Sequence, residues 1–365
     1  MTAESKTNTW TGGILSLVMF TGMAIVFSAC TSPTPPPPPA VDTTSHEFIW
    51  HLDTVGARGG LWDIAIIDEN NIWAVGDVYL RDSSGALDPD PYGLAKWNGT
   101  SWKLERVPYH GFGSSTLHPG PLFTIRAFGE NDVYVCSSTN LLWWNGVTWT
   151  EKAFFMQNLS FTGQVRKMWG ANGSDLYCVG RSGALYRFTG TTWTSIASGT
   201  DVDFKDIWGS TSGTRTEILV LASNGASFPL GKGLVRVEGS NTTVMPTDSL
   251  SDVLSSIWFW PNGKYFIAGS GFYSTQSLST PWIRNPMQSI FYMDCVRGTG
   301  TNDIVVVGSK MVSHYNGSTW RQFTSPEIPT FYGSYIGLAV KDNRVTAVGT
   351  ADDVPIVLTG IRLPP

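Results

Sequence analysis

Carboxylates, phenols and imidazoles gather in two stretches of this chain that are rich in Pro, Gly and Ser. Residues 77–92 read DVYLRDSSGALDPDPY, and residues 108–121 read PYHGFGSSTLHPGP. A third, short stretch near the C-terminus carries Asp352 and Asp353. Carboxylate oxygens are ligands for Ca²⁺, and aromatic side chains beside polar ones suit peptide or carbohydrate ligands. These stretches therefore hold the candidate functional residues, provided that the fold brings them together.

Recognisable catalytic motifs are absent from the sequence. It has no His-Glu-x-x-His, no Gly-x-Ser-x-Gly and no phosphate-binding loop. A sialidase would need an arginine triad with a Tyr/Glu pair, and no motif supports that role for Arg126, Arg166, Arg181 or Arg297. We therefore expect no catalytic residue and no bound metal, and Ca²⁺ is the one cofactor that the clustered carboxylates could take. No loop has the Asp-x-Asp-x-Asp-Gly pattern.

The cysteines predict neither a disulfide scaffold nor a metal site. Only four occur in the chain, at positions 30, 136, 178 and 295. Cys136 and Cys178 stand in equivalent strands of adjacent repeats but are offset by one residue, which predicts that they face opposite ways. We expect Cys136, Cys178 and Cys295 to be buried thiols.

Composition favours a large all-β domain. The chain has 365 residues, of which 15% are charged, with 39 Gly and 16 Trp, a composition that suits short strands joined by tight turns. The net charge is −5, so a protein that tracks nucleic-acid phosphates is not expected.

The N-terminal residues resemble a secretion signal with a lipid-attachment site. Residues 14–29 are almost wholly apolar and end in small side chains, and Lys6 is the only basic residue before them. Phe27-Ser28-Ala29-Cys30 resembles the bacterial lipobox, which implies that Cys30 is lipidated and becomes the mature N-terminus. The alternative is an uncleaved membrane anchor, for which the apolar run is short. Residues 30–45 then form a lipidated, Pro-rich linker, and polyproline II geometry predicts a spacer of roughly 45 Å.

After the linker, one pattern of strands recurs through the chain. Its plainest copy is TNDIVVVGSKMVSHYNGSTW, residues 301–320. Each copy begins with an apolar strand, and the copies follow one another about every 40–45 residues, which is the period of four-stranded propeller blades. These first strands are predicted at residues 61–67, 122–129, 165–170, 204–209, 254–260, 291–298 and 335–341.

The ends of the chain predict a closed ring. The last copy lacks the fourth strand that carries Trp, and residues 46–54 (HEFIWHLDT) supply an unpaired strand with Trp50 in the matching place. Pairing the two would leave no exposed sheet edge. We therefore predict an all-β, seven-bladed β-propeller over residues 46–365, whose last blade is closed by the N-terminal strand, after a signal peptide at 1–29 and a linker at 30–45.

Two further features of the repeats have local causes. Asn-Gly pairs at 98–99, 145–146 and 316–317 predict two-residue type I′ hairpin turns, in which both central residues have positive φ. The recurrent tryptophans are expected to pack between blades rather than to bind sugars; they are Trp50, Trp102, Trp149, Trp193, Trp282 and Trp320.

The repeats resemble those of bacterial Kelch and BNR (Asp-box) β-propellers, and the whole chain resembles repeat-bearing surface lipoproteins. The Asn-Gly-x-x-Trp hairpin is similar to the tail of an Asp-box, but the upstream Ser-x-Asp and the Kelch double glycine are both missing. The resemblance therefore implies an architecture and a lipid-anchored location, and no specific enzyme family.

In such a propeller, the loops between strands 2 and 3 of a blade share a face with the connections from strand 4 to the next blade, and insertions there carry function. Residues 77–92, 108–121 and the blade 7 loop are predicted to lie side by side on this face, with a shorter insertion at 223–233 and blade 5 contributing elsewhere on it. The candidate ligand-binding residues are Asp77, Tyr79, Asp82, Asp88, Asp90, Tyr92, Tyr109, His110, His118, Tyr273, Asp352 and Asp353.

The sequence thus predicts a non-catalytic binding module of the bacterial cell envelope that recognises a protein, peptide or glycan through its loop-rich face. One alternative is a glycan hydrolase or lyase that uses carboxylates on that face, and another is a structural subunit of an envelope complex. We expect a monomeric propeller that is lipid-anchored, at the outer rather than the inner membrane, facing the periplasm or the cell surface.

Overall fold

The computed structural model describes residues 43–111, 114–154, 164–225, 231–261, 263–285, 291–329 and 331–364. The predicted signal peptide, Cys30 and most of the Pro-rich linker lie outside this range. Val41–Pro365 forms one compact unit. Every regular element of the described residues is a β-strand, and none of these residues belongs to a helix that could span a membrane.

Seven four-stranded antiparallel sheets make up the unit, together with one two-stranded hairpin. Blade 1 contains β2 (Arg58–Asp68), β3 (Asn71–Tyr79), β4 (Tyr92–Trp97) and β5 (Trp102–Glu105), and the hairpin of β6 (Pro108–His110) and β7 (Leu117–Pro119) follows it. Blade 2 contains β8 (Thr124–Gly129), β9 (Asp132–Cys136), β10 (Asn140–Trp144) and β11 (Trp149–Phe154). Blade 3 contains β12 (Val165–Asn172), β13 (Asp175–Gly180), β14 (Leu185–Phe188) and β15 (Trp193–Ser195).

The remaining blades follow the same order. Blade 4 contains β16 (Phe204–Ser212), β17 (Arg215–Ser223), β18 (Lys232–Glu238) and β19 (Asn241–Met245). Blade 5 contains β20 (Leu254–Phe259), β21 (Tyr265–Gly269), β22 (Tyr273–Thr275) and β23 (Ile283–Arg284). Blade 6 contains β24 (Met293–Gly300), β25 (Asp303–Gly308), β26 (Met311–Tyr315) and β27 (Trp320–Phe323), and blade 7 contains β28 (Gly333–Lys341), β29 (Arg344–Ala351), β30 (Val354–Arg362) and β1 (Phe48–Thr54).

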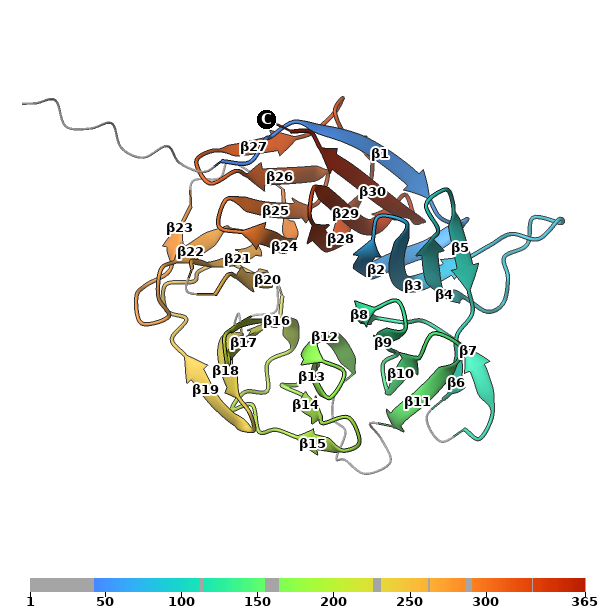
Figure 1. The fold of residues 1–365 in the computed structure, drawn as a ribbon, viewed down its shortest axis with the longest axis horizontal. Coiled ribbons are helices and arrows are strands. Elements are labelled where there is room, and N and C mark those ends of the chain that lie inside the picture. The colour runs from blue at the N-terminus through green and yellow to red at the C-terminus, as the bar shows by residue number, and fades with distance from the viewer. Residues whose placement is uncertain are drawn as a thin grey trace, which may run out of the picture. The chain divides into compact units, whose positions relative to one another are not determined.

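The blades close into a ring, as the repeats predict (Figure 1). The first strand of each blade is innermost and contacts the first strands of both neighbouring blades, and β2 and β28 complete the circle. The outermost strand of blade 7 is β1, which pairs with β30 from Phe48 opposite Arg362 to Thr54 opposite Ile356. The seven-bladed fold and its closure by the N-terminal strand are therefore confirmed.

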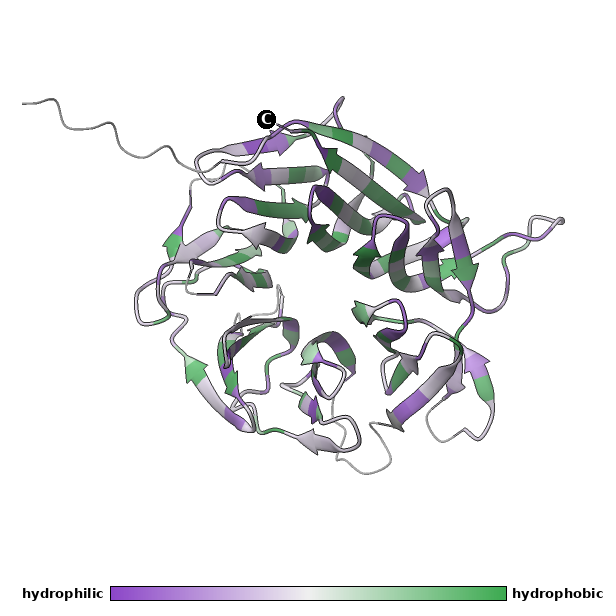
Figure 2. Ribbon diagram, in the orientation of Figure 1, coloured by the Kyte–Doolittle hydropathy of each residue, from purple (hydrophilic) through white to green (hydrophobic). Residues whose placement is uncertain are grey.

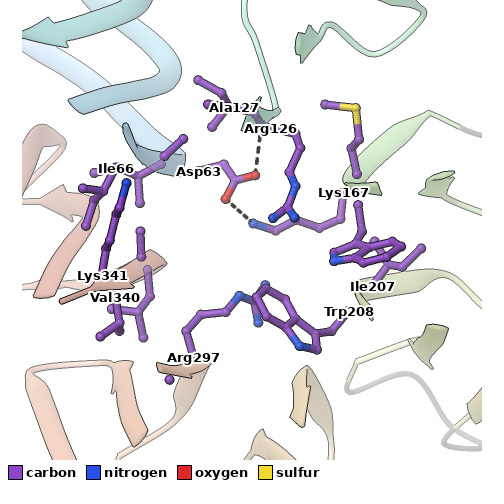
Figure 3. A pocket seen from close by; sticks show the side chains of 18 residues that line it. Asp63, Ile66, Arg126, Ala127, Lys167, Ile207, Trp208, Arg297, Val340 and Lys341 are labelled. Atoms are coloured by element: carbon purple, nitrogen blue, oxygen red, sulfur yellow. Dashed lines mark hydrogen bonds and ion pairs between the residues drawn. The ribbon is translucent and has the colours of Figure 1, made fainter. Parts of the chain in front are cut away.

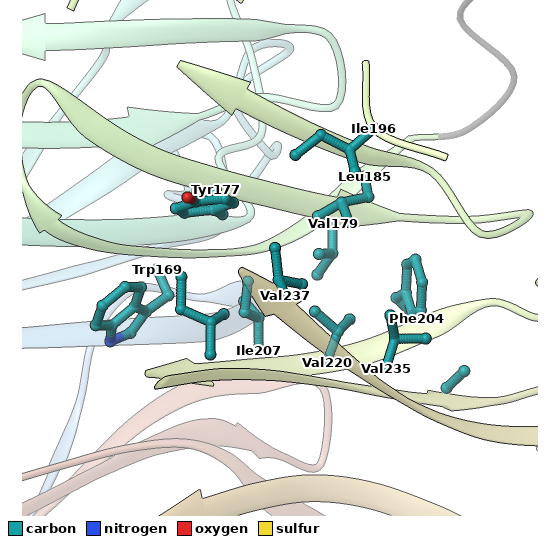
Figure 4. Close-up of a cluster of buried hydrophobic side chains, with 12 residues drawn as sticks. Trp169, Tyr177, Val179, Leu185, Ile196, Phe204, Ile207, Val220, Val235 and Val237 are labelled. Carbon is teal, nitrogen blue, oxygen red and sulfur yellow. The ribbon is translucent and has the colours of Figure 1, made fainter. Parts of the chain in front are cut away.

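The hydrophobic core lies between the blades. Each of seven clusters of buried side chains joins two neighbouring blades; one of them, shown in Figure 4, packs Tyr177 and Val179 of blade 3 against Val220 and Val235 of blade 4. Apolar residues are concentrated in the inner strands of the ring, while the outer strands are more polar (Figure 2). This explains the nearly continuous apolar runs of the second strands, since both of their faces are covered.

The recurrent tryptophans link neighbouring blades, as predicted. The indole of Trp102 donates a hydrogen bond to Asp53 of blade 7 at 3.1 Å, and that of Trp149 donates to Glu105 of blade 1 at 2.9 Å. The Trp320 ring packs edge-on against Phe272 of blade 5, with 5.1 Å between centroids. A packing role is thus sufficient to explain these residues.

A β-bulge near the start of the inner strand recurs in six blades. The extra residues are Trp62, Arg166, Lys205, Ser255, Asp294 and Ile336. In blade 2, Phe123 occupies the corresponding place directly before β8, and its N–H donates to the Cys136 carbonyl. In a bulge, the side chain of the extra residue departs from the regular alternation between the two faces of the strand. The bulges therefore place a set of such side chains near one end of the ring's axis.

The glycine that recurs in the second strand faces this bulge. A Cβ added to Gly76, Gly180, Gly269 or Gly308 would lie 2.0 Å from a backbone carbonyl oxygen in the inner strand or directly before it. At Gly349 the corresponding distance is 1.9 Å. The repeat keeps glycine at this point because the bulged strand approaches too closely for any side chain.

One local prediction was wrong. In the Asn-Gly turns only the glycines have positive φ, from 92° to 96°, so these are not type I′ turns. The reason is that the asparagine side chain caps the turn: Asn98 Oδ1 accepts the N–H groups of Thr100 and Ser101 at 3.1 and 2.9 Å. At this turn β4 ends at Trp97 and β5 begins at Trp102, and these two residues are paired across the hairpin.

The predictions for the cysteines are confirmed, but their consequence was not foreseen. Cys136 and Cys178 are buried thiols, as is Cys295, but the Sγ atoms of Cys136 and Cys178 lie 3.9 Å apart. Their offset of one residue does turn them to opposite faces of their own sheets. Because the two sheets face each other, opposite faces bring the thiols together across the interface of blades 2 and 3.

Candidate functional site

The predicted candidate residues of blade 1 lie partly in strands and partly in a loop. Strand β3 contains Asp77 and Tyr79, and β4 begins at Tyr92. The connection between these strands contains Asp82, Asp88 and Asp90. Asp77 accepts the Gly60 N–H at 3.0 Å, and burial raises the pKa of its carboxyl. Asp82 accepts hydrogen bonds from Ser84 and Ala86, which lower its pKa. These two carboxylates thus have local structural partners.

Arg106 gathers three of the predicted residues. Its guanidinium pairs with Asp88 at 3.0 Å and donates to the Asp90 carbonyl at 3.1 Å. It also lies over the Tyr92 ring, 4.0 Å from the centroid. Asp88, Asp90 and Tyr92 therefore form one cluster, in which the carboxylate of Asp88 is already neutralised by an arginine.

The residues of the 108–121 segment lie on or beside the β6–β7 hairpin. Tyr109 faces His118 across the hairpin, and its hydroxyl donates to the Pro121 carbonyl at 3.2 Å while burial raises its pKa to about 12. The His110 Nδ1 atom lies 2.9 Å from a carboxylate oxygen of Glu151. These contacts hold the hairpin against blade 2.

The remaining candidates occupy two places. Asp352 and Asp353 both have positive φ, at 50° and 64°, and form the tight turn between β29 and β30. The Asp353 carbonyl accepts the Gly59 N–H at 2.9 Å, so this turn adjoins blade 1, as expected. Tyr273 is buried in blade 5 and contacts Ser251 and Asp252. In the described part of the chain, no three His, Cys, Asp or Glu residues are grouped so that they could hold a metal ion.

A cavity of about 210 Å³ lies on the axis of the ring, lined by residues of β2, β8, β12, β16, β24 and β28. Its wall includes four cationic side chains, Arg126, Lys167, Arg297 and Lys341, and one carboxylate, Asp63 (Figure 3). Trp169, Trp208 and several aliphatic side chains complete it. An axial chamber rich in cations is suited to an anionic group.

Lys167 and Asp63 form one of two ion pairs at this cavity. The Lys167 Nζ atom lies 2.9 Å from Asp63 Oδ1, and Asp63 Oδ2 accepts hydrogen bonds from Thr124 Oγ1 and the Ile125 N–H at 2.7 and 3.1 Å. Burial alone would lower the pKa of Lys167, but the neighbouring Asp63 outweighs it and the pKa is raised. This lysine is therefore held charged by its partner.

Arg297 and Asp206 form the second pair. The two guanidinium Nη atoms lie 2.9 Å from the two oxygens of Asp206, and Asp206 also accepts from Ser256 Oγ at 2.6 Å and the Ile257 N–H at 3.0 Å. Burial would raise the pKa of Asp206, but Arg297 lowers it. The bidentate pair neutralises both buried charges.

Arg126 differs from these cations. Its Nε donates to the Gly170 carbonyl at 3.2 Å, and within the described residues no carboxylate oxygen lies within 4.0 Å of its guanidinium. Burial, together with the charge of Arg297, lowers its pKa to about 10. A cation so placed favours the arrival of an anion.

A second hollow, of about 380 Å³, lies where the inner strands begin. It is lined by residues that include Trp62, Phe123, Arg166, Lys205 and Ile336, and Lys167 lines both this hollow and the axial cavity. We call it the mouth. Since the inner strands start here, it lies on the face of the strand 4 to strand 1 connections, which is the face that the sequence predicts to be functional.

The mouth combines aromatic and cationic side chains. The rings of Trp62 and Phe123 stack with 4.8 Å between centroids and 9° between planes. Burial and the mutual proximity of basic groups, with Asp203 opposing, lower the pKa of Arg166 and of Lys205. In the described residues neither has a carboxylate oxygen within 4.0 Å. No motif in the sequence marks the mouth, although the recurrent glycines lie opposite the bulges that build it.

Comparisons with known proteins show the fold alone. No protein-family model and no curated protein sequence matches this chain. A structure of YCF48 bound to D1 peptide is 14% identical, covers 90% of this chain and 100% of its own, and has a TM-score of 0.63. A virginiamycin B lyase from Staphylococcus aureus with quinupristin is 9% identical, covers 85% and 99%, and scores 0.60. The WD40 propeller of Doa1 is 12% identical, covers 84% and 95%, and also scores 0.60.

Proposed function

We propose that this protein is a non-catalytic binding module that recognises an acidic peptide segment of another protein at the mouth. The observation that carries the proposal is the mouth itself, where the stacked rings of Trp62 and Phe123 stand beside Arg166 and Lys205. Aromatic and arginine side chains in a hollow are the usual anchors of peptide and protein ligands. Cations without carboxylate partners favour a ligand that brings its own negative charge.

The propeller context supports a peptide over other ligands. The similar YCF48 structure contains a bound peptide. A glycan hydrolase or lyase would need carboxyl groups that face the substrate, whereas the carboxylate in the axial cavity, Asp63, is paired with Lys167. Asp203, at the mouth, accepts the Ser182 N–H at 2.9 Å. These contacts favour binding over hydrolysis.

Peptide-array binding tests the proposal. Arrays of acidic, neutral and basic peptides would be probed with the wild-type protein and with the variants Trp62→Ala and Arg166→Gln/Lys205→Gln. We expect preferential capture of acidic peptides, and at least about tenfold weaker binding by both variants, as for loss of interface anchors. The matched controls are Trp260→Ala, which removes a 44% exposed tryptophan directly after an inner strand, at the opposite end from the mouth, and Arg215→Gln at the exposed start of β17.

Equal binding by the mouth variants and the controls would contradict the proposed site. Capture of glycans but not of peptides would replace the ligand class. Capture of neither, together with association into larger particles, would favour the structural-subunit alternative.

We also propose that the propeller is anchored in a bacterial envelope through a lipid on Cys30. This rests on the apolar run and the lipobox-like residues that precede the cysteine. Mass spectrometry of the mature protein tests it: we expect an acylated N-terminal Cys30, and an intact segment 1–29 would contradict the proposal. Fractionation of the membranes would then distinguish the outer from the inner one.

A further inference from the structure

We infer that the axial cavity is an anion site in which Arg126 binds a carboxylate group of the ligand. The inference rests on the proposed function in one respect, namely that the ligand enters from the mouth. It adds a specific chemical requirement: a free carboxylate, at the end of a peptide chain or on an acidic side chain, must reach below the mouth into the ring.

Charge balance is the first argument. Four cationic side chains line the cavity, and two of them are neutralised, Lys167 by Asp63 and Arg297 by Asp206. Lys341, at the far end of β28, is solvent-exposed and donates to the Ile67 carbonyl at 2.5 Å. Arg126 is thus the cation within the cavity whose charge has no carboxylate partner among the described residues, and burying such a charge is costly.

The orientation of Arg126 is the second argument. Its Nε is tied to the Gly170 carbonyl, and its guanidinium lies 5.8 Å from the Trp169 ring centroid, so the side chain is held from two directions. In Figure 3 it projects into the cavity beside Lys167. A guanidinium fixed in this way, with its Nη groups uncommitted to any carboxylate, presents the fork that binds a carboxylate in bidentate fashion.

The path to the site is the third argument. Lys167 lines both the mouth and the axial cavity, so a ligand held at the mouth lies next to the chamber that contains Arg126. The chamber, at about 210 Å³, suits a small group rather than a folded chain. Its tryptophans give it apolar walls, against which a charge-assisted hydrogen bond is stronger than in water.

A small dicarboxylate tests the site without any peptide. Thermal unfolding would be followed in malonate and in sodium chloride of equal ionic strength, for the wild type, Arg126→Gln and the exposed control Arg215→Gln. We expect malonate to raise the Tm of the wild type and of the control by about 2 °C relative to chloride, as for a weak ligand at saturating concentration. The shift should vanish in Arg126→Gln.

The same experiment separates binding from folding. Because Arg126 is a partly buried charge without a carboxylate partner among the described residues, its replacement by Gln should leave the Tm in chloride unchanged or higher. A malonate shift of equal size in Arg126→Gln, or none in the wild type, would overturn the inference.

Peptides captured by the wild-type protein identify the source of the carboxylate. Each would be compared with its C-terminally amidated form and with a form in which Asp and Glu are replaced by Asn and Gln. We expect one of these changes, and Arg126→Gln, to weaken binding at least about tenfold, as for loss of a hydrogen bond to a charged group. If mouth variants abolish peptide binding while Arg126→Gln does not, the proposed function stands and this inference fails. If malonate binding requires Arg126 but no peptide binds, the anion site stands and the peptide proposal fails.

Discussion

At the scale of single residues, two carboxylates each connect three consecutive blades. Asp63 of blade 1 accepts from Thr124 Oγ1 of blade 2, which in turn accepts the Met168 N–H of blade 3 at 3.1 Å. Asp206 of blade 4 accepts from Ser256 Oγ of blade 5, which accepts the Val296 N–H of blade 6 at 3.1 Å. In each case a cationic side chain of the third blade pairs with the carboxylate of the first: Lys167 with Asp63, and Arg297 with Asp206. These relays satisfy the polar groups that the bulges expose around the axis.

Removing the charge of Asp206 should therefore be strongly destabilising. In Asp206→Asn the buried guanidinium of Arg297 loses its carboxylate, and the free energy of unfolding should fall by about 3 kcal/mol. Chemical denaturation monitored by tryptophan fluorescence measures it. The control is Asp175→Asn, which breaks the more exposed pair with Arg187 and should cost less than about 1 kcal/mol. Equal losses for both variants would contradict the role assigned to Asp206.

The seam between blades 6 and 7 predicts a dependence on pH. The Nδ1 atoms of His46 and His314 lie 2.9 Å apart, and His314 Nε2 lies 3.2 Å from Asp303, which also pairs with Arg362. Burial, followed by His314 and Arg321, lowers the pKa of His46 from 6.5 to about 4, and burial likewise lowers that of His314. Below pH 6.5 there is thus a pH range in which both imidazoles are neutral in the folded protein but protonated in the unfolded chain.

Stability from these histidines is complete above pH 6.5 and is lost as the pH falls towards about 4. Asp303, whose pKa is lowered, acts only at still more acidic pH. We expect the Tm to fall over this interval, and to fall less in His46→Gln, as measured by calorimetry at several pH values. His51→Gln, on the exposed outer strand, serves as the control, and an unchanged pH profile in His46→Gln would refute the assignment.

At the residue scale, the sequence predicted the site only in part. It placed Asp88, Asp90 and Tyr92 near one another because turn-rich insertions must lie on one face of a propeller. It could not show that Arg106 neutralises Asp88, because that contact depends on side-chain geometry across the loop. It passed over Arg126 and Arg166 because single cations in apolar strands carry no motif, and only the closed ring brings them to one axis.

At the scale of elements, the bulge and its opposing glycine form one unit. The inner strand must bend to present an extra side chain to the mouth, and the second strand must then approach its carbonyl without a Cβ. The sequence predicted the strands from their apolar runs, but not the bulges, because one extra residue near a strand end does not alter the pattern visibly. The same glycine in five blades was the available signal.

Replacing one of these glycines tests the coupling. In Gly308→Ala the new Cβ would lie 2.0 Å from the Tyr292 carbonyl oxygen, so the unfolding free energy should fall by about 2–3 kcal/mol. Denaturant titration measures the change. The matched control is Gly129→Ala, since no atom lies within 4 Å of a Cβ added there and its φ is not positive. A loss no larger than that of the control would show that the strands can separate at the bulge without cost.

At the scale of the whole molecule, stability depends on closing the ring at β1. Trp50 stacks on Phe48 and packs edge-on against Phe323 of blade 6, with centroids 5.0 and 5.1 Å away. This closure was predictable because the last repeat lacked a strand and an orphan strand with Trp stood at the other end. The seven-bladed ring could be predicted from the number of repeat copies, whereas the side chains that line the axial cavity could not.

Shortening Trp50 should therefore weaken the entire fold. Trp50→Ala is expected to lower the unfolding free energy by about 3 kcal/mol through lost packing, and differential scanning calorimetry would show one cooperative transition at lower Tm. Ile49→Ala changes the neighbouring residue, which is 61% exposed, and should have an effect below about 0.5 kcal/mol. Two separate transitions in Trp50→Ala would indicate instead that blade 7 unfolds by itself.

The pairing of β1 with β30 also has a consequence for the order in which the protein is made. Residues 48–54 are synthesised first among the strands, and their partner, residues 354–362, is synthesised last. During translation or translocation, the earliest strand must wait, unpaired, for nearly the whole chain to follow it. Assembly of the ring therefore cannot finish while the C-terminal residues are still emerging, and a nascent chain interrupted before Val354 would carry an open edge at each end of its partly built circle.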